Sequence, residues 1–249
     1  MYERFVSSSR DFHDEKELLD LFTRSSTGLG QHLKVLEMRF LDPHESTVDE
    51  LLKHTRNLTN LYLHYWLNYD QNGRGTCVDT ERLSKSLRHV SRTLVELKVD
   101  YKFGVGLNQE YDWPISDLEH SPMNLRHLTA LRTLSIPASI LLGWRMDEAP
   151  EPGDLLPPSL VTLTFLRDSS YEYKTSMGSL QPFERMLATF AGSKRWMKWT
   201  PCLESICVRV GFWCESEEEQ KGRSDTTKRI LEDNGLTYIE SREGLIEWS

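Results

Sequence analysis

The chain has 249 residues and a formal net charge of −8, and 38% of its residues are hydrophobic. The acidic balance argues against non-specific nucleic-acid binding, which needs a basic surface. No apolar run approaches the roughly 18 residues of a membrane span, and the polar N-terminus lacks a signal-peptide core. Four cysteines do not make a disulfide scaffold. We therefore expect an intracellular protein, cytoplasmic or nuclear, that does not bind a membrane or a nucleic acid.

The apolar residues are strongly biased towards leucine, with 36 Leu and only 5 Ala. Helical bundles use alanine freely where helices approach closely, and alanine is the best helix former. The bias therefore argues against a helical bundle or a coiled coil. The modest hydrophobic share predicts a thin core.

Apolar residues at helical spacing predict a series of helices along the chain. The first, over residues 14–23, would form a helical cap that occupies residues 1–30. Further helices are expected over residues 46–54, 79–93, 121–128, 182–192 and 225–234. The helix over residues 79–93 would place Leu83, Leu87 and Val90 on one face, and Gly235 would cap the last helix.

A short motif recurs between these helices: Leu-x-x-Φ-x-Φ, where Φ is an aliphatic residue or Phe. Each copy predicts a turn followed by a short buried strand. A weaker seventh copy starts at Leu236, where Ile239 takes the first Φ position and Ser241 breaks the pattern. The six full copies are Leu33/Leu36/Met38, Leu58/Leu61/Leu63, Leu94/Leu97/Val99, Leu131/Leu134/Ile136, Leu160/Leu163/Phe165 and Leu203/Ile206/Val208.

The alternation of helix and strand predicts an α/β fold, an irregular leucine-rich-repeat solenoid with a curved parallel sheet. It would contain about seven repeats over residues 31–249, with a cap formed by the C-terminal tail. Leucines stacked from turn to turn explain the excess of Leu over Ala. The alternative is a compact, doubly wound α/β domain. It is disfavoured because the strands are short and because Gly104-Val105-Gly106 lacks the third glycine of a phosphate-binding loop.

Three successive segments resemble the leucine-rich-repeat-like region of fungal F-box proteins. They are Leu131-Arg-Thr-Leu-Ser-Ile136-Pro137, then Leu141-Leu142-Gly143, then Leu156-Pro157-Pro158-Ser159-Leu160-Val-Thr-Leu163. The resemblance implies recognition of protein substrates for cullin-type ubiquitin ligases. Residues 1–32 do not match the helical F-box that binds the ligase adaptor. The adaptor would therefore be a partner only if an F-box lies upstream, and otherwise the module has been lost.

Two sets of residues are candidates for binding a protein partner. Residues between the Φ positions should point away from the core, because side chains alternate along a strand. This strand-face set is Glu37, Arg39, Tyr62, His64, Lys98, Asp100 and Arg209. Aromatic residues follow the strands and would form a rim at one edge of the sheet, or would fold inward and cover the ends of the core. This rim set is Tyr65, Trp66, Tyr69, Tyr101, Trp113, Trp144, Tyr171, Tyr173 and Trp213.

The sequence carries no pattern typical of catalysis or of metal binding. Cys202, Cys207 and Cys214 lack the spacing of a zinc site, and the histidines do not form a helical metal-binding pair. We expect a protein that recognises another protein, performs no chemistry and needs no cofactor or metal. The alternatives are a stand-alone repeat scaffold unrelated to ubiquitination and, less favoured, an enzyme on a compact α/β fold.

Overall fold

The computed structural model describes residues 4–8, 29–40, 45–68, 78–104, 121–143, 150–166, 181–209 and 217–241. The strands are β1 (Arg4–Ser8), β2 (Val35–Phe40), β3 (Asn60–Asn68), β4 (Glu96–Gly104), β5 (Thr133–Pro137), β6 (Thr162–Leu166), β7 (Ser205–Arg209) and β8 (Thr237–Ser241). The helices are α2 (Leu29–His32), α3 (Glu45–His54), α4 (Thr80–Ser86), the 3-10 helix η1 (Leu87–Val90), α5 (Ala138–Leu142), α6 (Pro152–Leu155), α8 (Gln181–Gly192), α9 (Trp196–Trp199) and α10 (Glu217–Glu232).

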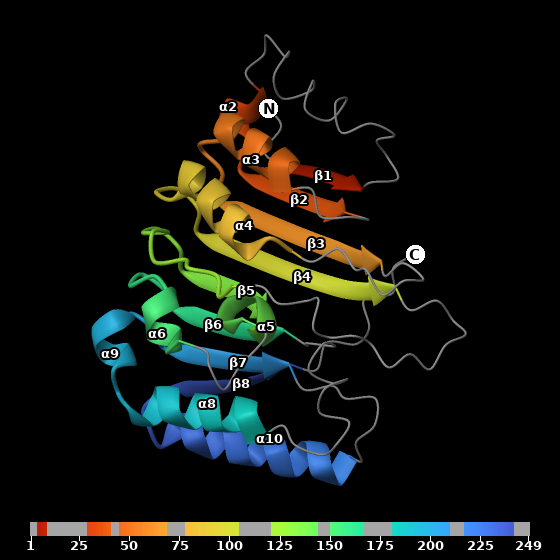
Figure 1. Ribbon diagram of the computed structural model, residues 1–249. Helices are drawn as coiled ribbons and strands as arrows, with labels where there is room; N and C mark the ends of the chain where they lie inside the picture. The colour runs from red at the N-terminus through yellow and green to blue at the C-terminus, as the bar shows by residue number, and fades with distance from the viewer. Residues whose placement is uncertain are drawn as a thin grey trace.

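The eight strands form one open sheet in which every neighbouring pair is parallel. Their order in the sheet is their order in the chain, so each new strand is added at the same growing edge. Figure 1 shows this stack running from β1 to β8, with the helices along one side. The predicted α/β class with a parallel sheet is confirmed.

Leucines of the repeated motif form the inner face of the sheet. Leu36, Leu61, Leu97, Leu134 and Leu163 occupy one continuous register row and are at most 1% exposed. Helices cover this row with their own apolar residues, which include Leu51 and Leu52 of α3, Leu83 of α4, Leu187 of α8 and Leu231 of α10.

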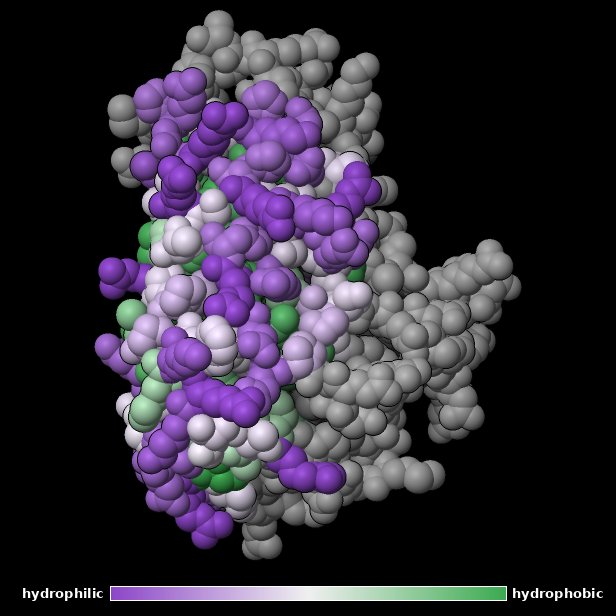
Figure 2. Space-filling view, turned by 60° about the vertical axis from the view of Figure 1, so that its left-hand side comes forward, coloured by the Kyte–Doolittle hydropathy of each residue, from purple (hydrophilic) through white to green (hydrophobic). Residues whose placement is uncertain are grey.

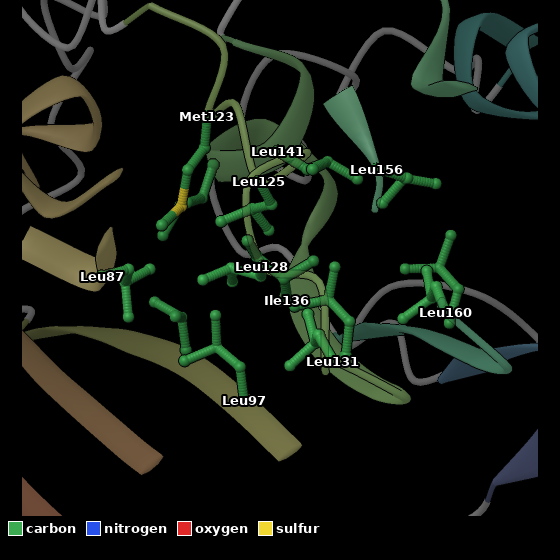
Figure 3. Packing of buried hydrophobic residues seen from close by; sticks show 14 of the residues in the cluster. Leu87, Leu97, Met123, Leu125, Leu128, Leu131, Ile136, Leu141, Leu156 and Leu160 are labelled. Atoms are coloured by element: carbon green, nitrogen blue, oxygen red, sulfur yellow. The ribbon is translucent and has the colours of Figure 1, made fainter. Parts of the chain in front are cut away.

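Short helices and turns also contribute to the core around β5, as Figure 3 shows. The core thus consists of the inward-facing residues of one sheet, covered by one layer of helices.

A ladder of backbone hydrogen bonds joins the turns that precede the strands. The carbonyl of Lys34 accepts from the amides of Thr59 and Asn60, at 2.9 and 3.0 Å. The carbonyl of Thr59 then accepts from Val95 and Glu96 at 2.7 and 3.0 Å. The same two-donor pattern continues at the carbonyls of Val95, Arg132 and Val161. Each turn is therefore fixed to the next before its strand begins.

Polar side chains reinforce this ladder in the same direction. Thr93 Oγ1 donates to the carbonyl of Arg56 at 2.9 Å, and Ser159 Oγ donates to the carbonyl of Leu131 at 2.8 Å. Asn57 Nδ2 donates to the carbonyl of Gln31 at 2.8 Å. These bonds hold adjacent turns at a fixed separation, which keeps the leucine row in register.

Most of the helices predicted from spacing are present. The segment 79–93 forms α4 and η1, with Leu83, Leu87 and Val90 buried as predicted. Residues 46–54 lie in α3 and residues 182–192 in α8. The last helix begins at Glu217, earlier than predicted, and Gly235 with φ 83° follows its end.

The predicted helix over residues 121–128 is wrong. The amide of Met123 donates to the carbonyl of Leu141 at 3.0 Å, and the amide of Leu125 donates to the carbonyl of Leu155 at 2.8 Å. These two amides bond to α5 and α6, and the segment's own bond, from the Leu128 amide to the Leu125 carbonyl at 3.0 Å, closes a turn and does not start a helix. Met123, Leu125 and Leu128 are buried all the same (Figure 3). The apolar spacing of this segment therefore reflects its burial in the core and does not indicate a helix.

Two ends of the sheet also differ from expectation. Residues 4–8 form strand β1 instead of helical cap, with Phe5 in register with Leu36; the helix expected over residues 14–23 lies outside the described residues. In β8 the residue in register with Ile206 is Tyr238, so Ile239 takes an outer position and is 43% exposed. The seventh copy is one residue shorter between its leucine and its strand than the other copies.

Replacing Leu134 by alanine tests the leucine row. Leu134 is fully buried between Leu97 and Leu163. The variant is expected to lose about 2–5 kcal/mol of unfolding free energy, through lost apolar burial and a residual cavity. Urea denaturation followed by circular dichroism measures this loss. Val95→Ala is the control, because Val95 is 37% exposed, and it should cost less than about 0.5 kcal/mol. Equal losses would contradict the assigned core.

Candidate functional site

The outer face of the sheet, on the side away from the helices, is the candidate site. It brings the predicted strand-face residues together in two register rows. Glu37 is paired with Tyr62 and Tyr62 with Lys98. In the second row, His64 is paired with Arg39 on one side and with Asp100 on the other. Arg209 lies apart from both rows, in β7 opposite Ser241 of β8.

Glu37 lies at the centre of a charged cluster at one end of these rows. Its two carboxylate oxygens accept hydrogen bonds from Arg4 and Arg39, each at 3.1 Å. Burial of the carboxyl group would raise its pKa, but the bonds from Arg39 and Arg4 and the nearby charge of His64 together lower the pKa below 4.5. Glu37 is therefore held as a carboxylate between two guanidinium groups.

A second cluster lies at the start of β3 and β4. Asn60 Nδ2 donates to Glu96 Oε2 at 2.7 Å and to the hydroxyl of Tyr62 at 3.3 Å. Burial raises the pKa of Tyr62 above 10.0; the bond from Asn60 opposes this and the charge of Glu96 adds to it. His64 Nδ1 lies 3.8 Å from Asp100 Oδ2. The outer face of β1–β4 therefore combines the ion-paired Glu37 cluster with the hydrogen bond between Asn60 and Glu96.

Three residues of this face were not predicted from the sequence: Arg4, Asn60 and Glu96. Asn60 lies two residues before Tyr62 in β3, and Glu96 lies two residues before Lys98 in β4. The same alternation along the strand would therefore have identified both. Arg4 belongs to β1, which carries no leucine of the motif.

The outer face changes character beyond β4. Ser135 is half-buried, whereas Thr164 and Cys207, its successors in the row, are 9% and 6% exposed. Ser205 Oγ donates to Thr162 Oγ1 at 3.2 Å. Small, buried groups thus replace the charged and aromatic side chains of β2–β4. This change is confined to the strands up to β7, because Thr237 and Ile239 at the outer positions of β8 are exposed.

Two residues assigned to the aromatic rim lie in the core instead. Tyr65 and Tyr101 belong to β3 and β4 and are 2% and 6% exposed. The hydroxyl groups of Tyr101 and the fully buried Ser139 lie 2.8 Å apart in a hydrogen bond. These two strands have nine residues each, so the inward alternation continues one step past the motif. The rim prediction is wrong for both residues.

The other aromatic residues of the rim set are not tested. Trp66 lies in β3 in register with Lys102. The remaining ones lie outside the described residues: Tyr69, Trp113, Trp144, Tyr171, Tyr173 and Trp213. For these the rim stays a prediction.

No group of three or more His, Cys, Asp or Glu side chains suited to a metal ion occurs within the described residues. Cys207 is buried and lies on the outer face of the sheet, whereas Cys202 is exposed in the turn before that strand. The side chains of the described face interact through hydrogen bonds and ion pairs.

Comparison of the chain with known protein families, with curated proteins and with solved structures finds no match. Among the helices in the described ranges, none is long and apolar enough to cross a membrane.

A pH series on Glu37→Gln tests the Glu37 cluster. A carboxyl group whose pKa is lowered by folding stabilises the protein above its unfolded pKa, and this contribution is lost as the pH falls through the folded pKa. Between pH of about 7 and about 3, the wild type should lose more unfolding free energy than Glu37→Gln. Urea denaturation at each pH measures the difference. The Arg4→Gln/Arg39→Gln variant should likewise lose less unfolding free energy than the wild type on acidification, because the bonds that lower the pKa of Glu37 are gone. Parallel curves for wild type and Glu37→Gln would contradict the ion pairs.

A double-mutant cycle tests the inward position of Tyr101. Tyr101→Phe leaves the Ser139 hydroxyl buried without this partner, so it should lower the unfolding free energy by about 1–2 kcal/mol. Adding Ser139→Ala should cost less than the sum of the two single changes. Urea denaturation of the four proteins measures the coupling, and strict additivity would refute the hydrogen bond.

Proposed function

We propose that this chain is an irregular leucine-rich-repeat solenoid that recognises a protein partner on the outer face of its sheet and performs no chemistry. The observation that carries this proposal is the order of the parallel strands. Eight strands follow one another in the sheet as they do in the chain, which is the arrangement of stacked repeats. A doubly wound sheet would instead reverse its strand order at a switch point.

Within the described ranges, all the helices lie on one side of the sheet and none covers its outer face (Figure 1). On β1–β4 this face carries Glu37, Tyr62, Lys98, His64 and Asp100 on a backbone fixed by the sheet. Extended surfaces of this kind, built from adjacent repeats, are what repeat proteins use to bind other proteins. Paired charges suit recognition by geometry and hydrogen bonding, because a partner must replace existing bonds to bind.

The resemblance of residues 131–163 to fungal F-box proteins supports a more specific version of the proposal. In it, the chain is the substrate-binding region of a ubiquitin-ligase receptor. The segments that carry the resemblance form β5, α5 and the turn leading into β6, and their leucines are buried. They act as structural elements, so a scaffold outside the ubiquitin system uses them equally well.

A capture experiment with two matched variants tests recognition by the outer face. Tyr62→Ser/Lys98→Ser alters two register neighbours on that face, and Arg82→Ser/Lys85→Ser alters two exposed positions on α4. Immobilised proteins are incubated with lysate of the source cells, and recovered proteins are quantified by mass spectrometry. Specific partners should fall at least about fivefold with the sheet variant and stay unchanged with the helix variant.

Both variants should melt at the wild-type temperature by circular dichroism. Partner recovery that is unchanged in the sheet variant would refute the outer face as the binding surface. Capture with the longest natural reading frame separates the two versions of the proposal. Recovery of a cullin-ligase adaptor would support the version in which the chain belongs to a ubiquitin-ligase receptor. Failure to recover the adaptor would favour the version in which the chain is a scaffold outside the ubiquitin system.

A further inference from the structure

Basic residues are concentrated in the segments that lead into strands β2–β8. With η1, α6 and α9 counted as parts of the segments before β4, β6 and β7, and with residues 121–132 taken as the described segment before β5, these segments contain nine Lys or Arg and four carboxylates: Glu151, Asp154, Glu204 and Asp233. The chain as a whole has 30 Lys and Arg against 38 Asp and Glu. The nine residues form what we term the basic edge: Lys34, Arg56, Arg88, Arg92, Arg126, Arg132, Lys194, Arg195 and Lys198.

The topology brings these residues to one side of the molecule. All strands are parallel, so the segments that lead into them lie along the same edge of the sheet. The hydrogen-bond ladder described above links these segments in turn, for example through the carbonyls of Arg56 and Arg132. Figure 2 brings this edge towards the viewer and shows a largely hydrophilic surface. The basic edge is therefore built on a rigid backbone.

Much of this positive charge is not neutralised by the described part of the protein. All nine side chains belong to exposed residues. Arg195 pairs with Glu151 at 2.8 Å. In contrast, Arg56, Arg88, Arg92 and Arg132 make no ion pair with any carboxylate of the described residues. Four exposed guanidinium groups on adjacent turns create a local positive potential on an acidic protein.

We propose that the basic edge binds an acidic segment of a protein partner. Arginine is suited to this task because its planar guanidinium group binds carboxylates in a bidentate manner. The inference stands apart from the proposed function, because the basic edge and the outer face are different surfaces and each can be altered without the other.

Two observations favour an acidic protein segment over a nucleic acid. Single-stranded nucleic acids need exposed aromatic rings on which bases stack. On this edge, Trp196 is 5% exposed, and the ring of Trp199 has Arg126 and Lys198 each 4.8 Å from its centre. In addition, the net charge of −8 repels a long polyanion that extends past the edge. A short acidic segment confined to the edge avoids this repulsion.

The test compares removal of three charges from the edge with removal of three charges elsewhere. The edge variant is Arg56→Gln/Arg92→Gln/Arg132→Gln, and the control is Arg82→Gln/Lys228→Gln/Arg229→Gln at exposed positions of α4 and α10. The probe is a fluorescein-labelled peptide of ten alternating Glu and Ser residues, followed by fluorescence anisotropy at low salt. The edge variant should bind at least about tenfold more weakly than wild type, and the control within about twofold. Wild-type binding should also weaken steeply with added salt.

Each remaining outcome would overturn the proposal. These outcomes are equal losses in both variants, no binding of the peptide by the wild type, or tighter binding of a ten-nucleotide polyuridine RNA or of phosphatidylserine vesicles than of the peptide. Melting by circular dichroism establishes that the variants fold. If the triple variant does not fold, the single variants Arg56→Gln and Arg92→Gln replace it, each with an expected loss of about twofold.

Discussion

The stacking of one buried leucine row on the next is the constraint on which the rest of this structure depends. Each motif leucine has a fixed offset from the strand that follows it, and that strand is in register with its neighbours from Leu36 to Leu163. A shift by one residue would turn every leucine of a strand to the opposite face. The burial of the row therefore determines which side chains face outward and where each turn lies.

The turn ladder and the leucine row support each other. A carbonyl such as that of Lys34 or Thr59 accepts two amides from the next turn, which satisfies polar backbone groups beside an apolar core. The two-donor bond also sets the point where the following strand begins. Segments of different length between the strands are accepted, because only the few residues from turn to strand must repeat.

The sequence predicts the central part of this fold because the motif encodes both the buried row and the preceding turn. It fails where other interactions take over. Strand β1 carries Phe5 but no leucine of the motif, so only its pairing with β2 reveals it as a strand. In β8, Ile239 matches the pattern by type, but the shorter spacing places Tyr238 at the inner position. Tyr65 and Tyr101 extend the inner rows because β3 and β4 continue beyond the motif, a length that local spacing does not encode.

The candidate surfaces differ in how well local sequence reveals them. Alternation along a strand places Glu37, Tyr62 and Lys98 on the outer face, and the structure adds that they share a row. The basic edge is harder to recognise from the sequence, because its residues are far apart in the chain and do not share one offset: Arg56 and Arg92 precede their motif leucine by two residues, whereas Lys34 and Arg132 follow theirs by one. Only the parallel order of the strands makes them neighbours.

The two surfaces also imply different physics of recognition. The Arg4–Glu37–Arg39 cluster on the outer face is already paired within the protein, so under the proposed function a partner there would gain little from these charges and would have to match shape and hydrogen bonds. The guanidinium groups of Arg56, Arg88, Arg92 and Arg132 are not paired with described carboxylates, so binding at the basic edge depends on opposite charge and on ionic strength. Under the two proposals, the outer face would select a partner by its geometry, whereas the basic edge would attract an oppositely charged segment from a distance.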